Sequence, residues 1–142
     1  MNQVDRVKQS FAKQRIMQTI GATLSHVGSG DVHITLPVRP DLTQQHGYLH
    51  AGVVATIADS ACGYAALTVM PDDAAVLSIE FKVNMLAPAE GIRVTARGRV
   101  IKPGRTIVVC VADVYAERDG GEKLVATMTG TMMVVRGREI AD

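Results

Sequence analysis

The chain has 142 residues, of which 47% are hydrophobic and 20% are charged, and its net charge at neutral pH is +1. This length suits a single domain spanning residues 1–142, and the composition excludes an intrinsically disordered chain. The small net charge, with no long run of either sign, argues against partnership with nucleic acid or with a membrane surface.

The cysteines and the first residues indicate the compartment. Cys62 and Cys110 lie in apolar segments without the spacing of metal ligands, so we expect free thiols in the core of a protein from a reducing compartment. Residues 1–21 mix charges and lack the continuous apolar segment of a signal peptide, so we expect a cytoplasmic location.

The first half of the chain begins with a helical pattern. Residues 4–19 carry apolar side chains at helical spacing, which predicts a short amphipathic helix. Residues 21–38 alternate apolar and polar side chains around a Gly-Ser-Gly-Asp turn, which predicts a β-hairpin. Residues 39–48 are polar and predict a loop.

A long helix is predicted from His50 to Met70, ended by Pro71. Residues 49–70 approach the ~20 residues that span a bilayer. Their many small and hydroxylated side chains, the absence of flanking lysine or arginine, and the carboxylate of Asp59 near the middle argue against a membrane helix.

The second half of the chain reads as strands joined by short turns. The predicted strands cover residues 77–85, 92–99, 106–117 and 123–135. The third is apolar on both faces, which is typical of an interior strand. We therefore expect an antiparallel meander and, for the whole chain, an α+β fold in which an antiparallel sheet wraps around the long helix, with a short N-terminal helix beside it.

Asp59 is the one carboxylate between Leu42 and Pro71. Burying an unpaired carboxylate is costly, so the residue needs an explanation. Its helical neighbours three and four positions away are all small, and they are Ala55, Thr56, Cys62 and Gly63. Small neighbours let a ligand or another chain segment approach the carboxylate. The alternative is a structural aspartate that hydrogen-bonds the backbone of an adjacent element.

The start of this helix offers a second candidate site. His50 precedes Asp59 by nine residues, about 180° around a helix, so we predict that the two share a site only when His50 comes from another copy of the chain. Free N–H groups of Ala51 and Gly52 would form an anion site that suits a developing oxyanion, unless this is an ordinary helix start.

A metal site near the helix start is a weaker hypothesis. His46 and His50 are spaced as i and i+4, and Asp59 is a further possible ligand. Gly47 separates the two histidines before any helix signal, and no third ligand lies nearby in the sequence, so we predict no metal here.

The segment QQHGYLHAGVVATIADSACGYAA, residues 44–66, resembles the signature of hotdog-fold acyl-CoA thioesterases of the phenylacetate-degradation and 4-hydroxybenzoyl-CoA thioesterase type. The family pattern is Asn-x-x-Gly-x-x-His-Gly-Gly, followed on the helix by an acidic residue. The matching positions are Gly47, His50, Gly52 and Asp59. The resemblance extends to the N-terminal helix, to residues 30–38 and to residues 77–91.

Two positions depart from the commoner pattern. Gln44 stands where many members have Asn, although Gln occurs in the 4-hydroxybenzoyl-CoA branch and can also donate an amide hydrogen bond. Ala51 replaces the first glycine of the pair, which keeps the N–H donor and narrows the space beside it.

The resemblance implies a single hotdog thioesterase domain that hydrolyses an aryl or a short- to medium-chain acyl-CoA to the free acid and CoA. Asp59 would be the nucleophile or general base, and the N–H of Ala51, beside Gly52, would polarise the thioester carbonyl. Gln44 and His50 would position the thioester or the water, and Ser78 would help to hold that water. The site would require a homodimer, which can pair further into a homotetramer, and no cofactor beyond the CoA of the substrate.

The predicted substrate-binding residues are Gly47, Cys62, Gly63, Lys82, Asn84, Arg97, Arg99, Lys102 and Arg105. The cations among them would meet the phosphates of CoA, although each suits a solvated strand face equally well.

Two other functions remain open because one fold can serve several activities. A hotdog hydratase or dehydratase is disfavoured because the histidine opens the helix in the manner of a thioesterase. A non-catalytic acyl-CoA binding or sensing protein is disfavoured because Asp59 is present and no basic helix-turn-helix pattern precedes the domain.

Overall fold

The computed structural model describes residues 1–137, 140 and 142. The helices are α1 (Gln3–Lys13), α2 (Arg15–Ile20) and α3 (Ala51–Leu67), with a short 3₁₀ turn, η1, at Pro40–Leu42. The strands are β1 (Thr23–Gly28), β2 (Asp31–Pro37), β3 (Ala75–Met85), β4 (Arg93–Lys102), β5 (Ile107–Arg118) and β6 (Gly121–Val135). Within the described residues these six strands form one antiparallel sheet in the order β1-β2-β4-β5-β6-β3.

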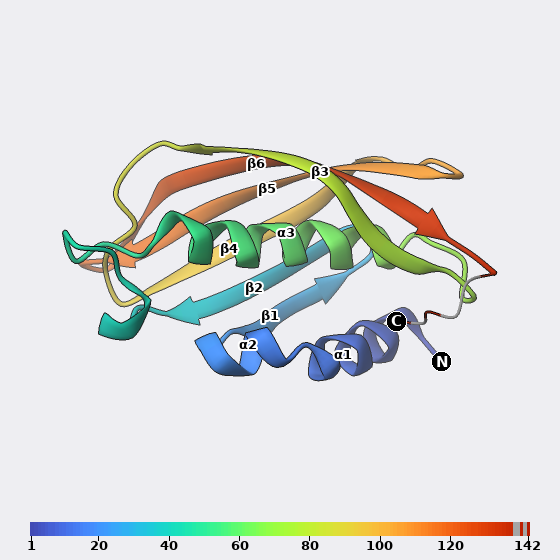
Figure 1. Cartoon of the computed structure of the whole chain (residues 1–142), viewed down its shortest axis with the longest axis horizontal. Coiled ribbons are helices and arrows are strands. Elements are labelled where there is room, and N and C mark those ends of the chain that lie inside the picture. The colour runs from blue at the N-terminus through green and yellow to red at the C-terminus, as the bar shows by residue number, and fades with distance from the viewer. Residues whose placement is uncertain (138–139, 141) are drawn as a thin grey trace.

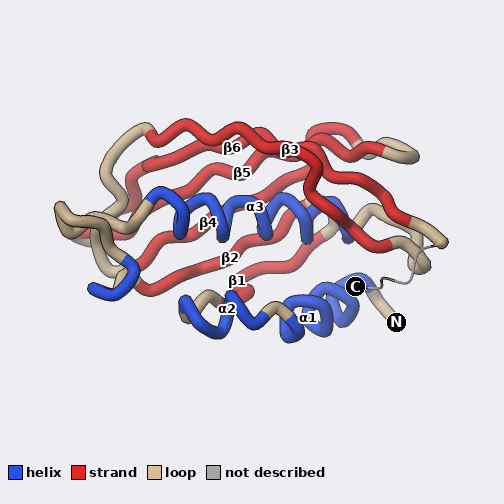
Figure 2. The backbone as a smooth tube through the Cα atoms, in the orientation of Figure 1, coloured by secondary structure: helices blue, strands red, loops and turns tan. Residues whose placement is uncertain are grey.

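The sheet curves around α3, which runs along its concave face, while α1 and α2 lie beside the β1 edge (Figures 1 and 2). This confirms the predicted α+β class, with a long helix embraced by an antiparallel sheet. The strand over 106–117 is β5, and it lies between β4 and β6 as its apolar pattern predicted.

Alternation along the strands divides the sheet into a core face and an outer face. In β2 the side chains of Val32, Ile34 and Leu36 are fully buried beneath α3, while Asp31 and His33 point to the outer face. Helix and sheet approach closely at Gly98 of β4, where a Cβ atom would stand 2.4 Å from the backbone of Ala61 in α3. A glycine is therefore required at this contact.

Two sequence predictions are wrong in detail. The helix predicted over 4–19 is two helices, because Gln14 has an extended backbone with ψ 96°. The predicted four-strand meander is also wrong. β3 pairs with β6 at the far edge, and β2 takes its place beside β4, so residues 86–92 cross the end of the sheet instead of making a hairpin turn. Alternation reveals which face a residue occupies but not which strand lies beside it.

The membrane alternative receives no support. Among the helices of the described residues, none combines the length and the apolarity needed to span a bilayer.

Candidate active site

One stripe of α3 is left uncovered by its own chain. The half-buried or exposed residues of this stripe are Gly52, Ala55, Thr56, Asp59, Ser60 and Gly63. The opposite face, which includes Ile57, Ala58 and Ala61, is fully buried against the sheet. The carboxylate of Asp59 thus lies at the boundary between the core and an open face, not inside the core.

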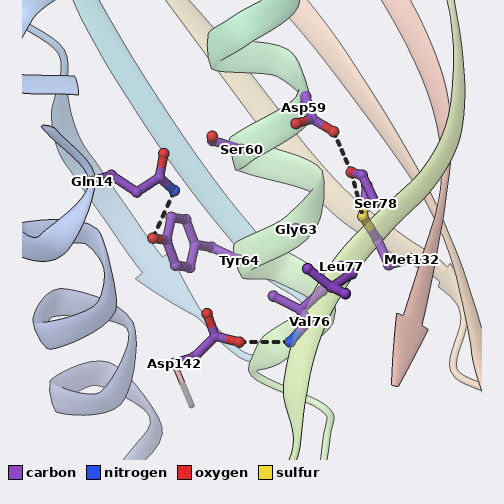
Figure 3. Close-up of a pocket in the computed structure, with 10 residues that line it drawn as sticks. All are labelled: Gln14, Asp59, Ser60, Gly63, Tyr64, Val76, Leu77, Ser78, Met132 and Asp142. Carbon is purple, nitrogen blue, oxygen red and sulfur yellow. Dashed lines mark hydrogen bonds between the residues drawn. The ribbon is translucent and has the colours of Figure 1, made fainter. Parts of the chain in front are cut away.

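Asp59 is held by a strand that is distant in sequence. Its Oδ1 accepts a hydrogen bond from the hydroxyl of Ser78 in β3, and the same hydroxyl lies 3.1 Å from Sδ of Met132 (Figure 3). The structure therefore brings together two of the residues predicted from the sequence. The interaction leaves Oδ2 of the carboxylate free of any hydrogen bond within the described chain.

A cleft opens beside this pair (Figure 3). Its walls are Ser60 and Gly63 of α3 on one side and Val76 and Leu77 of β3 on the other. A second opening on the same stripe is lined by Gly52, Ala55, Thr56 and Asp59, with Phe81 of β3 across from them. Both openings expose the Asp59 carboxylate to a molecule bound against the helix.

The far end of the cleft carries two residues that the sequence did not reveal, Gln14 and Tyr64. Nε2 of Gln14 donates to the hydroxyl of Tyr64 over 2.8 Å, and Ser10 Oγ lies 3.2 Å from the same hydroxyl. Burial raises the pKa of Tyr64, so this end of the cleft presents a neutral hydroxyl. Gln14 lies at the break between α1 and α2, and no sequence signal marked that break.

The side chain of Gln44 stabilises the loop before α3 through hydrogen bonds to the backbone. Its Oε1 accepts hydrogen bonds from the backbone N–H groups of His46, over 2.6 Å, and Tyr48, over 3.3 Å. Gly47 has φ +86°, a conformation that favours glycine, and so allows the tight turn. Because the carbonyl end of the Gln44 amide holds the loop, its Nε2 is the end available to a ligand.

His50 is the N-cap of α3, and one prediction at this point is wrong. Nδ1 of His50 accepts the N–H of Gly52 over 2.8 Å, so that N–H is not free for an anion. The N–H of Ala51 has no acceptor within the described residues, as predicted. Since Nδ1 of His50 is an acceptor, the neutral imidazole carries its proton on Nε2 and can donate outward.

The helix start and the carboxylate open into different clefts. Gln44, His50 and Ala51 line a cleft closed by Met85 and Leu86 at the end of β3, and Asp59 is not among its lining residues. This agrees with the predicted separation of His50 and Asp59 around the helix.

β3 runs past both clefts as an edge strand. Within the described residues its hydrogen-bonded neighbour is β6, and its other edge is unpaired. Four of its apolar side chains are between 43% and 51% exposed, namely Leu77, Ile79, Phe81 and Met85. An exposed apolar edge strand of this length is a ready template for pairing with another strand.

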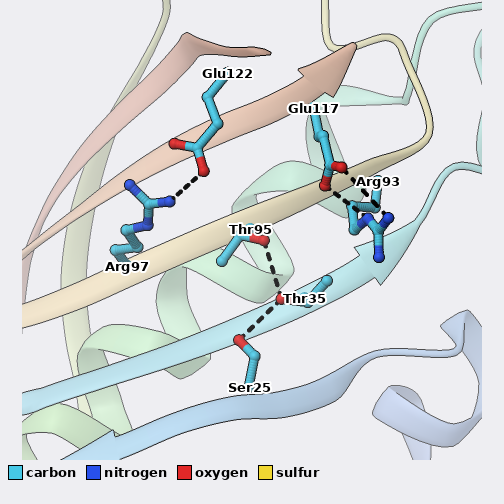
Figure 4. Close-up of polar contacts among 7 residues, drawn as sticks. All are labelled: Ser25, Thr35, Arg93, Thr95, Arg97, Glu117 and Glu122. Atoms are coloured by element: carbon cyan, nitrogen blue, oxygen red, sulfur yellow. Dashed lines mark hydrogen bonds and ion pairs between the residues drawn. The ribbon is translucent and has the colours of Figure 1, made fainter. Parts of the chain in front are cut away.

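The predicted CoA-binding cations lie elsewhere on the chain. On the outer face of the sheet Arg97 forms an ion pair with Glu122 at 2.6 Å (Figure 4). Its guanidinium also stacks 4.4 Å above the ring of Tyr115. The strand registers put Arg99, Lys82 and Asn84 on that same outer face. Lys102 and Arg105 lie at the β4–β5 turn. In the described chain these six residues line neither the Asp59 clefts nor the Ala51 cleft, and their role in binding CoA stays a prediction.

Gly63 and Cys62, the two small helical neighbours of Asp59 that were predicted to contact the substrate, lie in different surroundings. Gly63 lines the Asp59 cleft, whereas Cys62 is fully buried and faces Gly130 of β6. Cys62 and Cys110 are free thiols, as predicted. Burial raises the pKa of Cys110 to about 12 and raises that of Cys62 further, so neither is a competent nucleophile near neutral pH.

Comparison with known proteins agrees with these observations. Residues 46–123 match the family model of the thioesterase superfamily. The structure of a thioesterase family protein from Silicibacter pomeroyi superposes with a TM-score of 0.94 at 51% identity, covering 96% of this chain and all of that one. A thioesterase from Haemophilus influenzae superposes with a TM-score of 0.82 at 26% identity, covering 94% of this chain and 91% of that one.

A sequence relative with a named reaction is the 1,4-dihydroxy-2-naphthoyl-CoA hydrolase of Listeria monocytogenes. It is 29% identical over 87% of this chain and 98% of its own length. The family match covers the last residues of the loop from His46, the helix that carries Asp59 and the strand that carries Ser78. The hotdog arrangement of the structural relatives is the one seen here. The chain therefore belongs to the thioesterase superfamily and is a thioester hydrolase.

Proposed function

We propose that this chain hydrolyses acyl-CoA thioesters to the free acid and CoA, with Asp59 as the general base or nucleophile. The observation that carries the assignment is the placement of the Asp59 carboxylate. It lies on the uncovered stripe of α3, accepts a hydrogen bond from the Ser78 hydroxyl and faces an open cleft. The hydrolysis of a CoA thioester by the Listeria relative supports CoA as the thiol.

We further propose that two copies of the chain build each site. The unpaired edge of β3 carries Leu77 and Ser78 near one end, beside Asp59, and Met85 at the other, beside the Ala51 cleft. Antiparallel pairing of β3 with β3 of a second copy would bring opposite ends together. The partner's helix start would then lie near Asp59, and the exposed apolar side chains of β3 would be covered.

The reaction follows from the groups so assembled. The carbonyl oxygen of the thioester accepts the N–H of Ala51, which stabilises negative charge as the carbonyl is attacked. In the water-mediated route Asp59 takes a proton from water, the water oxygen bonds to the carbonyl carbon, and the C–S bond then breaks to release the CoA thiolate. In the covalent route a carboxylate oxygen of Asp59 bonds to the carbonyl carbon and the C–S bond breaks to release the CoA thiolate; water then hydrolyses the resulting anhydride to the free acid and restores the Asp59 carboxylate. Gln44 Nε2 and the Nε2–H of His50 are donors suited to orienting the thioester.

The cleft supports an aryl or a short- to medium-chain acyl group. Its strand side is apolar, with Val76 and Leu77, and Phe81 stands at the neighbouring opening. Gly63 supplies room rather than contacts on the helix side, because a Cβ atom there would meet nothing within 4 Å.

The first test is thiol release from a panel of aryl, short-chain and medium-chain acyl-CoAs by the native chain and by Asp59→Asn. We expect the substitution to lower kcat by about 10²–10⁴-fold, since an amide can neither accept the proton nor attack. Asp113→Asn is the matched control, because Asp113 also accepts a hydroxyl hydrogen bond, from Thr127, but on the outer face. Activity within a few-fold of native in a folded Asp59→Asn chain would refute the assignment, and so would a native chain that releases no CoA.

A second experiment tests the shared site. Ala51→Pro removes the N–H that would bind the oxyanion, and proline is well tolerated at the first position of a helix. We expect this variant to lose about 10²–10³-fold in kcat. Refolding equal amounts of this variant and Asp59→Asn together should restore about a quarter of the native rate. Random pairing makes about half of the dimers mixed, and each mixed dimer carries one intact site out of two. No restoration, with mixed dimers present, would contradict a site built from two copies.

A further inference from the structure

The β1–β2 hairpin carries two imidazoles and a carboxylate on the outer face of the sheet. Asp31 and His33 of β2 point outward because the intervening Val32 is fully buried against the core. His26 of β1 is the cross-strand partner of His33. These three residues lie on the face opposite α3, and none lines the clefts beside Asp59.

A β-bulge turns His26 toward this cluster. Leu24 packs against the core, so the residue two positions later would share its inward face in a regular strand. The register shift between Leu24 and His26 makes Ser25 the extra residue, and His26 consequently faces outward beside His33. Gly28 leaves space for the ring, since a Cβ atom there would stand 3.1 Å from Nε2 of His26.

The three side chains converge through the atoms that bind metals. Nε2 of His26 lies 3.2 Å from Oδ2 of Asp31, and Nε2 of His33 lies 3.0 Å from Oδ1. The three candidate ligand atoms all fall within 4.8 Å of one another. Ligands at the usual bond lengths of about 2.0–2.2 Å in a tetrahedral site are separated by roughly 3.3–3.6 Å, so only a small adjustment would admit an ion.

We propose that His26, Asp31 and His33 bind one divalent transition-metal ion of the Zn²⁺ class. Imidazole nitrogen with one carboxylate is a donor set that suits Zn²⁺, Ni²⁺ and Cu²⁺ better than Mg²⁺ or Ca²⁺. Each imidazole moves its proton from Nε2 to Nδ1 on binding, and Asp31 supplies a negative charge. The side chains of His26 and Asp31 are 47% and 48% exposed, which leaves the remaining coordination positions to water.

The surrounding charges are compatible with a cation. Arg97 stands opposite His33 in the strand register, but its guanidinium is occupied by Glu122 and lies over Tyr115, on the side away from β2. Arg99 stands opposite Asp31, and its positive charge weakens the affinity without removing a ligand. The bound ion would cross-link the edge strand β1 to β2, at a position outside the hydrolytic site.

The test uses the four histidines of the chain as reporters. Zn²⁺ is titrated into the full-length protein while the imidazole resonances of His26, His33, His46 and His50 are followed by NMR. We expect one equivalent of Zn²⁺ to shift the resonances of His26 and His33 and to leave the other two unchanged. Isothermal titration calorimetry on the same sample measures stoichiometry and affinity.

Three variants complete the experiment. His33→Gln and Asp31→Asn should each weaken Zn²⁺ binding at least roughly tenfold, with the fold monitored by circular dichroism. His46→Gln removes an exposed histidine outside the cluster and should bind Zn²⁺ as the native chain does. Shifts at His46 and His50 instead, undiminished binding by folded His33→Gln, or no binding by the native chain would each overturn the proposal. None of these results depends on hydrolytic activity.

Discussion

Gly98→Ala tests whether the contact between α3 and β4 sets the position of the helix that carries Asp59. A Cβ atom at residue 98 would stand 2.4 Å from the carbonyl carbon and oxygen of Ala61 and 2.9 Å from the backbone nitrogen of Cys62. An ordinary contact begins near 3.4 Å, so the helix would have to retreat by about 1 Å. These are backbone atoms, and no side-chain rotation can relieve the overlap.

The expected cost follows from that geometry. Overpacking a filled core costs typically 1–3 kcal/mol, and a clash with helix backbone belongs at the upper end, about 3 kcal/mol. For a chain of this size the loss should lower Tm by roughly 10 °C. Urea unfolding at one fixed protein concentration measures it, because association would otherwise change the apparent stability.

The matched control is Gly121→Ala, another strand glycine. A Cβ atom there would meet its nearest neighbour, the carbonyl oxygen of Arg118, at 3.9 Å, so we expect little change in the free energy of unfolding. Equal stability of the two variants would refute the reasoning, because it would show that helix and sheet can separate at Gly98 without cost.

Two further predictions concern stability. Arg6 is 7% exposed and donates to the carbonyl oxygens of Leu67, Met70 and Ala74, at and after the C-terminal end of α3. The oxygen of Leu67 also accepts the N–H of Met70, so Arg6→Met should cost about 2–3 kcal/mol in urea unfolding mainly by depriving the oxygens of Met70 and Ala74 of their donor. Arg6→Lys should lower the free energy of unfolding by less than Arg6→Met does, and equal losses for the two variants would contradict this explanation. The pKa of Cys110 is raised by burial from 9.0 to about 12, so the unfolded chain loses this proton first and stability should fall as pH rises above about 9. Burial also raises the pKa values of Cys62 and Tyr64, so these two groups likewise lower the stability as the pH rises. Unfolding free energies measured from about pH 8 to pH 10.5 check this, and a flat or rising profile would contradict it.

Much of the site could be predicted from local sequence. The position of Asp59 on a helix with small neighbours predicted an approachable carboxylate, and the structure leaves that stripe of α3 uncovered. The nine-residue spacing from His50 predicted separate surroundings for the two side chains, and they line different clefts. Helical geometry is fixed by the residue count, so inferences of this kind need no knowledge of the rest of the fold.

The capping of α3 could not be predicted in the same way. The helix was predicted to begin at His50, and His50 is instead its N-cap, with Ala51 the first helical residue. The side chain of His50 accepts the N–H of Gly52 and leaves that of Ala51 as the available donor. This choice depends on a side-chain rotamer. Gln14 and Tyr64 meet through a break between α1 and α2, and no pattern of apolar residues marked that break.

The sequence by itself determined the class of fold, the strands and the faces of residues where the strands alternate regularly, because alternation and helical spacing are properties of the local chain. Only the tertiary structure decided which strands are neighbours. It moved β3 to the far edge, where Ser78 reaches Asp59, and it placed His26 beside His33 through one extra residue in β1. Strand pairing is chosen by contacts between segments distant in sequence, and a single-residue change of register reverses the face of every side chain that follows it.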